Sequence, residues 1–342
     1  MKRLLIFVIL LIVVGAASLA GVAWWVDQSM RQNVDPQGEP IVIVIESGSS
    51  LHRVARLLDE AGVLDSRDAF VWYTRYRGLA QEIKAGEYEI LPGITGLQVL
   101  EKLVAGEVFL HTVTLVEGWT YREALLAMQA HPAIRVTQKV DDPAATMAAL
   151  GRSDLHPEGR FFPDTYRFER DTSDLQLLGV ALERMDVELE RAWAGRKPDL
   201  PIETPDELLT LASIIEKETA LDSERPEIAG VFVRRLNKRM RLQTDPTVIY
   251  GIGPAFDGNL RRRDLNTDTP YNTYTRHGLT PTPICLPGRE SLAAAADPAA
   301  GTSLFFVATG DPDGSHYFSD TLEEHNAAVA RYLKKLKSGA NR

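Results

Sequence analysis

Residues Leu208–Gly251 read LLTLASIIEKETALDSERPEIAGVFVRRLNKRMRLQTDPTVIYG. This stretch predicts an apolar helix that meets polar sequence at Glu216–Thr219, then a second amphipathic helix and a compact polar loop. A carboxylic acid held against aliphatic side chains at a helix end can stay protonated near neutral pH. We therefore expect the chemistry of the chain to lie here, with the rest of the fold built around it.

Two glutamates compete for the role of the acid. Glu216 and Glu218 are two residues apart, so on a helix they point about 200° away from each other and cannot act as a close pair. Glu218 lies over Ile214 and Ile215, whereas Glu216 lies over Ala212 and a serine. Most glutamates are exposed, so position alone favours two surface residues. If one is buried, desolvation should raise the pKa of Glu218 more, from about 4.3 towards about 6.

Composition limits the classes of function. The 342 residues suffice for two or three domains, and 44% hydrophobic with 25% charged residues is typical of globular proteins. A net charge of −9 argues against a nucleic-acid partner, and short basic runs such as Arg234-Arg235 are interpreted as solvated faces. The single Cys285 excludes an intrachain disulfide. Without Cys/His clusters or a glycine-rich phosphate loop, we expect neither a metal nor a cofactor.

The N-terminus predicts a membrane anchor. A basic pair at positions 2 and 3 precedes the apolar run Leu4–Val26, which is long enough to span a bilayer as a helix. The Trp24-Trp25 pair suits the far interface. A cleaved signal peptide with Ser18–Ala20 as the cleavage site is the alternative, although the apolar run continues past that site. Either way, the chain after residue 27 is expected outside the cytoplasmic membrane.

A repeated unit follows a polar linker at residues 27–40. Three segments each predict a strand, a glycine turn and a helix capped by Ser or Thr: Ile41–Ile45 with the helix from Leu51, Glu87–Leu91 with Leu97–Val104, and Thr112–Val116 with a helix ending near Met128. Thr95 with Gln98 and Thr120 with Glu123 fit capping boxes. Ordinary α+β packing explains the pattern; the first unit also resembles a LysM-type module, a small fold associated with N-acetylglucosamine-containing glycans.

An aromatic block lies at Pro157–Phe168. It places four aromatic residues around Glu158 and Asp164. Rings beside carboxylates suit a sugar cleft, where they stack on pyranose faces. A buried aromatic cluster under a loop is the equally supported alternative.

Several blocks together resemble the YceG-like family, the inner-membrane endolytic lytic transglycosylases of peptidoglycan. They are Glu158–Tyr166, Glu216–Thr219, Ser223–Arg225, Arg241–Gly251, Tyr271–Tyr274, His316–Phe318 and His325–Asn326. The resemblance covers nearly the whole chain and implies that Glu218, the second glutamate of EKET, is the catalytic acid. It agrees with the preference from helical spacing.

The resemblance implies a reaction with one carboxylate. Glu218 would protonate the MurNAc–GlcNAc β-1,4 bond and then, as a base, help form a 1,6-anhydro-MurNAc end. The candidate substrate-binding residues are Gln243, Thr244, Asp245, Tyr271, Asn272, Thr273, Glu158 and Tyr166. His316 and His325 are interpreted mainly as C-terminal packing. Two alternatives stay open: a hydrolytic muramidase with Asp245, Asp164 or Glu158 as partner, and a membrane-anchored glycan-binding scaffold without catalysis.

The expected architecture is α+β. It comprises a transmembrane anchor at 1–26, the linker at 27–40, a LysM-like and repeated region at 41–130, and a mixed, mainly helical lysozyme-like catalytic domain at 131–342. The resemblance implies a single-pass protein of the inner membrane with its catalytic domain in the periplasm. Its expected partners are peptidoglycan glycan strands, the membrane and, by family analogy, peptidoglycan synthases.

Overall fold

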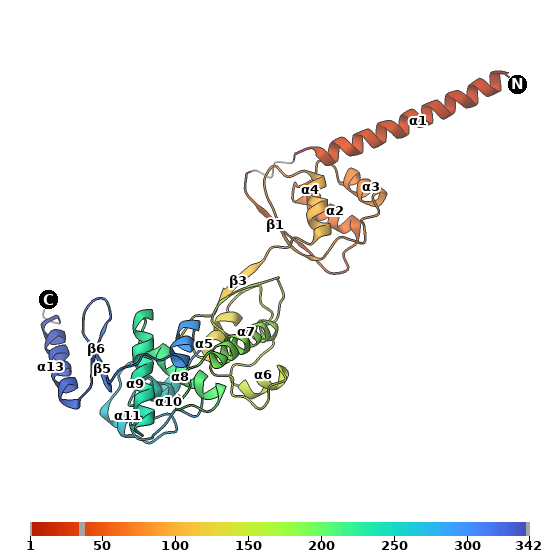
Figure 1. The fold of residues 1–342 in the computed structure, drawn as a ribbon. Helices are drawn as coiled ribbons and strands as arrows, with labels where there is room; N and C mark the ends of the chain where they lie inside the picture. Colours follow the sequence, from red (N-terminus) through yellow and green to blue (C-terminus); the bar gives the residue numbers. More distant parts are fainter. Residues whose placement is uncertain (1, 34–37, 340–342) are drawn as a thin grey trace. The chain divides into compact units, whose positions relative to one another are not determined.

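The computed structural model describes residues 2–33 and 38–339, and the chain forms two compact units (Figure 1). The first unit holds Met1–His111 and Arg167–Asp171, and the second holds Thr112–Tyr166 and Thr172–Arg342. This division differs from the boundary expected at residue 130, because the third strand–helix segment packs with the second half of the chain. Positions 34–37 of the expected linker, Met1 of the anchor and positions 340–342 lie outside the described residues.

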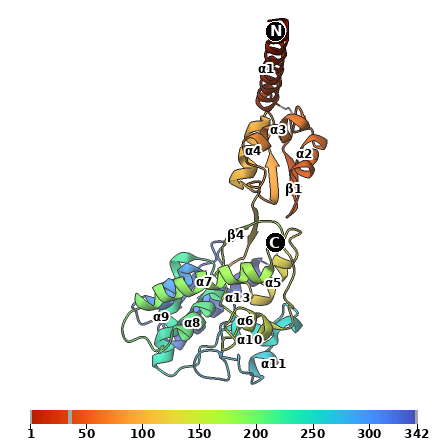
Figure 2. The ribbon, with the colours of Figure 1, turned by 90° about the vertical axis from the view of Figure 1, so that its right-hand side faces the viewer.

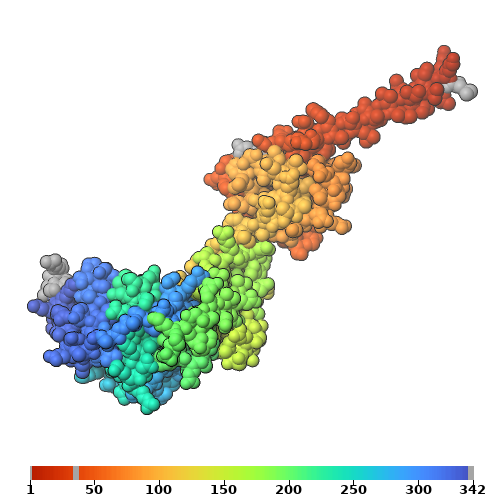
Figure 3. Space-filling view, in the orientation of Figure 1, coloured from red at the N-terminus to blue at the C-terminus, as the bar shows by residue number. Residues whose placement is uncertain are grey.

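The N-terminal helix α1 extends over Lys2–Arg31. Among the described residues it is the one helix long and apolar enough to cross a membrane, with a mean hydropathy of 2.9, a character that signal sequences share. It stands clear of the rest of the first unit along most of its length (Figure 3). Its last turns differ: Val26 and Met30 are buried, and Arg31 pairs with Asp27 at 2.9 Å. Residues 27–31 of the expected linker are therefore helical.

The first unit is a small α/β assembly. Strands β1 (Ile41–Ile45) and β2 (Gly86–Ile90) pair antiparallel, with Ile43 opposite Tyr88. Burial alternates along β1, since Ile43 and Ile45 are buried while the valines between them face outward. Three helices complete the unit: α2 (Leu51–Glu60), α3 (Arg67–Tyr76) and α4 (Gly96–Ala105).

The predicted helix starts are confirmed. Ser50 caps α2 by accepting from the Arg53 backbone N–H, and Thr95 with Gln98 forms the predicted capping box of α4. In the second unit Thr120 with Glu123 forms the capping box of α5 (Tyr121–Gln129). Each cap satisfies backbone N–H groups that the first helical turn leaves free.

The second unit is mainly helical, so the chain as a whole is α+β. Besides β1 with β2, the described residues form two further strand pairs: β3 (His111–Thr114) with β4 (Thr165–Phe168), and β5 (Phe305–Ala308) with β6 (His316–Ser319). The helices after α5 are α6 (Pro143–Ala149), α7 (Asp174–Ala194), α8 (Pro205–Glu218), α9 (Arg225–Asn237), α10 (Asp245–Ile252), α11 (Arg262–Asn266), α12 (Arg289–Ala296) and α13 (Leu322–Gly339).

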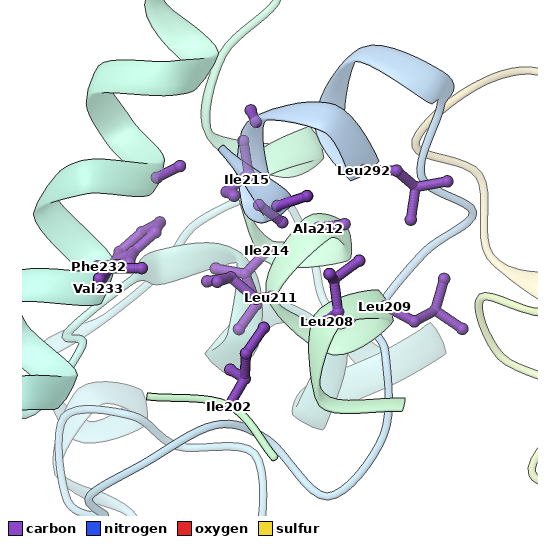
Figure 4. Close-up of a cluster of buried hydrophobic side chains, with 14 of the residues drawn as sticks. Ile202, Leu208, Leu209, Leu211, Ala212, Ile214, Ile215, Phe232, Val233 and Leu292 are labelled. Atoms are coloured by element: carbon purple, nitrogen blue, oxygen red, sulfur yellow. The ribbon is translucent and has the colours of Figure 1, made fainter. Parts of the chain in front are cut away.

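Helix α8 lies at the centre of the second unit. Every residue from Leu208 to Ile215 is buried, because α7, α9, α10 and α12 pack around it (Figures 2 and 4). A helix that is apolar on all sides is stable only in such a place. Thr204 caps its start, with Pro205 in the first turn. The buried helix therefore fixes the position of whatever residue ends it.

Candidate functional site

Glu218 is the last residue of α8. The following Thr219 is extended, with φ −146° and ψ 142°, so the helix ends there. One carboxylate oxygen, Oε1, accepts a hydrogen bond from the Thr244 hydroxyl. Burial raises the pKa of Glu218 to about 7, and the nearby Asp245 acts in the same direction, while the Thr244 hydrogen bond and Arg235 oppose it. The negative end of the helix dipole also disfavours a carboxylate here. Glu218 is thus an acid that is half protonated near neutral pH.

Glu216 has a different set of partners, as the helical spacing predicts. Its carboxylate accepts from Arg225 Nη2 at 3.3 Å and from the Gly288 backbone N–H at 2.9 Å. The Arg225 side chain is only 6% exposed and also pairs with Asp222. Glu216 therefore links α8 to α9 and to the segment before α12, and its role is structural.

A third carboxylate, Glu117, joins this cluster. It lies 4.0 Å from Arg225, and burial together with the charge of Glu216 raises its pKa. A Cβ on Gly288 would lie 1.9 Å from Glu117 Oε1, so the Glu117 carboxylate reaches close to the backbone just before α12. The sequence shows Glu117 only as part of a strand–glycine turn, and no local signal links it to residues so far along the chain.

The backbone of Thr244 is held by a network of threonines. The Thr244 backbone N–H donates to Thr273 Oγ1 at 3.1 Å, and Thr273 Oγ1 lies 2.9 Å from Thr247 Oγ1. Just before it, the exposed Gln243 has a φ of 52° and donates its N–H to the Thr273 carbonyl at 3.2 Å. Non-glycine residues seldom adopt this left-handed conformation. The backbone is thereby turned so that Thr244 faces Glu218.

The segment predicted as a polar loop after α9 is largely helical, which corrects that prediction. Only Arg241–Thr244 is loop, and Asp245–Ile252 forms α10. Pro246 in the first turn explains this, because its fixed φ and missing N–H suit the start of a helix. Asp245 is not a side-chain cap; its Oδ1 accepts from the Tyr274 hydroxyl at 2.5 Å.

Asn272 braces the neighbouring loop. It is buried, and its Nδ2 donates to three backbone carbonyls, those of Asp264, Leu265 and Thr267. Its Oδ1 accepts from the Tyr274 N–H at 2.8 Å. With its polar atoms occupied in this way, Asn272 shapes the loop that presents Thr273.

Glu158 is a second buried acid. It is 4% exposed and accepts from the Tyr121 backbone N–H at 2.8 Å and from the Tyr250 hydroxyl at 3.0 Å. Burial raises its pKa to about 7, against the effect of these hydrogen bonds. The Tyr250 ring meets Tyr271 edge to face at 4.9 Å, and the Tyr271 hydroxyl lies 2.9 Å from that of Thr282. Helix α10 is thus attached to Glu218 near its start and to Glu158 near its end.

The raised pKa of Glu158 predicts a pH-dependent effect of Glu158→Gln. The folded-state pKa of about 7 exceeds the ordinary 4.5, so the stability from the protonated form is full below pH 4.5 and is lost as pH rises through 7. A neutral amide avoids that loss, so the variant should gain up to about 3 kcal/mol relative to wild type between pH 5 and pH 8. Urea unfolding at both pH values measures the gain. An equal difference at the two pH values would contradict it.

The aromatic block is packed inside the protein. Phe161, Phe162 and Tyr166 are buried, and the Tyr166 hydroxyl donates to the Phe162 carbonyl at 2.6 Å. Phe161 lies against Tyr121 with ring centroids 5.5 Å apart. Of the two interpretations of this block, the geometry favours the buried cluster. Asp164, by contrast, is exposed and accepts from the Thr165 N–H at 2.7 Å.

The interpretation of the Arg234-Arg235 run as a solvated face is wrong, because both side chains bind backbone carbonyls. Arg235 is buried and donates to the carbonyls of Leu304 and Leu242, each at 2.7 Å. Arg234 likewise donates to the Ser303 carbonyl at 2.7 Å. The Arg235 guanidinium thereby fixes the chain just before Gln243 and places a positive charge near Glu218. A tandem arginine on an amphipathic helix carries no sequence signal for this role.

His316 and His325 have different contacts. His316 Nδ1 lies 2.7 Å from Glu224 Oε2, and Glu224 in turn accepts from the Thr219 hydroxyl at 3.4 Å. His316 therefore connects β6 to the residue that follows Glu218. His325 stacks on Phe305 at 5.2 Å, and burial lowers its pKa.

Comparisons with known proteins agree on one family. The YceG-like family model matches residues 43–331. The chain is 33% identical over 341 residues to the endolytic murein transglycosylase of Bacillus subtilis (strain 168), covering 94% of this chain and 91% of the relative. It is 27% identical over 360 residues to the enzyme of the same name from Streptococcus pneumoniae serotype 2, covering 96% of this chain and 64% of that relative.

A solved structure gives the same result. The crystal structure of a putative YceG-like protein from Listeria monocytogenes aligns with a TM-score of 0.55 and 31% sequence identity, over 85% of this chain and 99% of that one. The family match spans most of the chain, including β2, α8 and α10. With these matches and the arrangement around Glu218, the chain belongs to the YceG-like family.

Proposed function

We propose that this protein is a lytic transglycosylase that cleaves the glycan strands of peptidoglycan internally, with Glu218 as its catalytic acid and base. The observation that carries the proposal is the environment of Glu218. It ends α8, whose residues from Leu208 to Ile215 are all buried; its pKa is raised to about 7, and the Thr244 hydroxyl orients it. Its relatives, named endolytic murein transglycosylases, support this class of substrate and reaction.

The proposed reaction uses the same carboxyl group twice. Thr244 donates to Oε1, which leaves Oε2 to carry the proton. The acid gives this proton to the glycosidic oxygen of a MurNAc–GlcNAc β-1,4 bond, and the bond between that oxygen and C1 of MurNAc breaks. The carboxylate then takes the proton of the MurNAc C6 hydroxyl, whose oxygen bonds to C1. The products are a 1,6-anhydro-MurNAc end and a new GlcNAc end, and Glu218 is protonated again.

A second catalytic carboxylate is not needed in this scheme. Ordinary glycosidases pair two carboxylates across the bond. Here the C6 hydroxyl belongs to the reacting sugar, so its effective concentration at C1 is high. Glu216 is committed to Arg225, and Glu158 is buried beneath Tyr250. These contacts favour the single-acid reaction over a hydrolytic muramidase.

Neutral dipoles would stabilise the positive charge that develops on the sugar ring. Gln243 is exposed beside Thr244, and Tyr271 is partly exposed beside Tyr250, so both can reach a bound glycan. Asn272 would hold the neighbouring loop, and Thr273 would hold the Thr244 backbone, so both would act without touching the sugar. Asp245, exposed near Glu218, would bind sugar hydroxyls. Glu158 would support the substrate-binding surface indirectly, through its contact with Tyr250. The buried Tyr166 would stabilise the fold below that surface.

The finer architecture belongs to the same proposal. Helix α1 would be a single-pass anchor in the cytoplasmic membrane, with both compact units in the periplasm. The first unit, with two helices between paired antiparallel strands, resembles a LysM module and would bind glycan. We infer a lysozyme-like second unit, a proposal that the acid at the end of α8 supports. Anchoring would place cleavage near newly made strands, where peptidoglycan synthases are the natural partners.

Product analysis tests the reaction. Purified sacculi are digested with the full-length protein, and the muropeptides are analysed by mass spectrometry. Internal lytic cleavage gives strands ending in 1,6-anhydro-MurNAc, lighter by one water than hydrolytic products. Reducing MurNAc ends would establish a muramidase instead, and undigested sacculi would favour a glycan-binding scaffold.

The pKa of Glu218 predicts the pH dependence of the rate. The first step needs the protonated acid, so kcat/KM should fall as pH rises above about 7, by about tenfold per unit. Initial rates on soluble glycan strands between pH 5 and pH 9 measure this. A rate that is constant from pH 7 to pH 9 would show that Glu218 does not act as the acid.

A further inference from the structure

Two large aromatic side chains are exposed side by side on α3. Trp72 is 65% exposed and Tyr76 is 87% exposed. They are four residues apart and so lie on the same face of the helix. On the opposite face, Phe70, Val71 and Thr74 are buried in the core of the first unit. We call Trp72 and Tyr76 the α3 aromatic face.

Helix α3 lies at the end of the first unit from which α1 leaves (Figures 1 and 2). It packs against α1, and α1 also meets the start of α4, where a Cβ on Gly96 would lie 3.4 Å from the Met30 sulfur. Val26 and Met30 belong to the same buried cluster as Phe70. The last turns of α1 are therefore part of the core of the first unit.

This packing fixes how far the first unit stands from a bilayer that α1 would cross. Trp24 and Trp25 suit the interface, and Met30 follows only five residues later, about 7.5 Å along a helix. The polar interfacial layer of a bilayer is about 5–8 Å thick on each side. With Met30 buried in the unit, the surface beside α1 would lie close to the lipid headgroups.

Charges of both signs lie beside the α3 aromatic face: Asp68, four residues before Trp72, is 74% exposed and lies 3.7 Å from Arg67, and two arginines follow Trp72. Arg75 contacts His52 at 2.9 Å and Arg77 contacts the Tyr73 hydroxyl at 3.1 Å, and within the described part of the chain neither is paired with a carboxylate. Tryptophan and tyrosine are the residues enriched at membrane interfaces, and arginine adds attraction to anionic lipids.

We propose that the α3 aromatic face docks onto the headgroup layer of the bilayer that α1 crosses, so that the first unit lies on the membrane. The inference rests on the proposed anchoring role of α1 and is independent of the chemistry at Glu218. Two contacts, α1 and α3, would then restrain the tilt of the first unit, which a single helix alone does not.

Spin-label depth measurements test the docking. The native Cys285 is buried, so one added cysteine gives one accessible thiol. Tyr76→Cys, Trp25→Cys and Val44→Cys full-length proteins carry a nitroxide in nanodiscs of phosphatidylcholine and phosphatidylglycerol. Val44 is exposed on β1. The ratio of oxygen to nickel-chelate accessibility should be several-fold higher at Tyr76→Cys than at Val44→Cys, and Trp72→Ser in the Tyr76→Cys protein should lower it.

The outcomes distinguish the proposed docking of α3 from the proposed membrane anchoring by α1. A membrane-like label at Trp25→Cys with a water-like label at Tyr76→Cys overturns the docking and leaves the anchor intact. Water-like labels at both positions overturn the anchor itself. A Tyr76→Cys label that is water-like in nanodiscs but loses mobility on addition of soluble glycan strands makes α3 a glycan-binding face instead.

Discussion

Glu218→Gln should reduce the rate of glycan cleavage by about a hundredfold to ten-thousandfold, because an amide can neither donate the proton nor take it back. The fold should persist, since the amide oxygen can still accept from the Thr244 hydroxyl and a neutral group suits the buried site. Initial rates on soluble glycan strands, with muropeptide mass spectrometry of the products, measure the loss.

The matched control is Glu190→Gln, the same change at an exposed position on α7. It should cleave at the wild-type rate. If Glu218→Gln is folded by circular dichroism and also cleaves at that rate, the proposed mechanism fails. If Glu218→Gln loses both activity and fold, Thr244→Val tests the mechanism instead. This variant keeps the acid but removes the hydroxyl that orients it, so it should lower kcat more than it changes KM.

Glu216→Gln should instead destabilise the fold by about 3 kcal/mol, because it removes the charge of a buried partner of Arg225. Arg225 already has a buried Nε without a hydrogen-bond partner among the described residues, so it has little capacity to adapt. Urea unfolding at pH 7 measures the change. The folded fraction should retain cleavage activity, since Glu216 takes no part in the chemistry.

Asp222→Asn provides the comparison for this prediction. Asp222 also pairs with Arg225, but its side chain is 77% exposed, so solvent screens the pair and the loss should be well under 1 kcal/mol. Equal losses for Glu216→Gln and Asp222→Asn would contradict a special role for the buried pair. A folded Glu216→Gln protein without activity would place Glu216 in the catalytic site.

Local patterns predicted much of the fold. The bounds of β1 and the capping boxes at Thr95 and Thr120 depend on residues within a few positions of one another. The separation of Glu216 from Glu218 follows from helical geometry in the same way. The mainly apolar run from Leu208 to Ile215 likewise favours burial of the middle of α8.

Other features depend on contacts between distant residues. The loop expected at 241–251 became α10 because Pro246 starts a helix that packs on α8, and the basic run at Arg234-Arg235 turned inward to bind carbonyls of distant segments. The boundary near residue 111 follows from how α5 packs, which sequence periodicity does not report.

The sequence alone determined which glutamate is the candidate acid. Helix periodicity and the aliphatic residues before Glu218 suffice for this, because they belong to the same helix as Glu218. Only the tertiary structure decided what surrounds that acid. Thr244 is 26 residues from Glu218 along the chain, and Tyr250 is 92 residues from Glu158. The pKa of each carboxyl is set by burial and by these partners, and both exist only once the helices have packed.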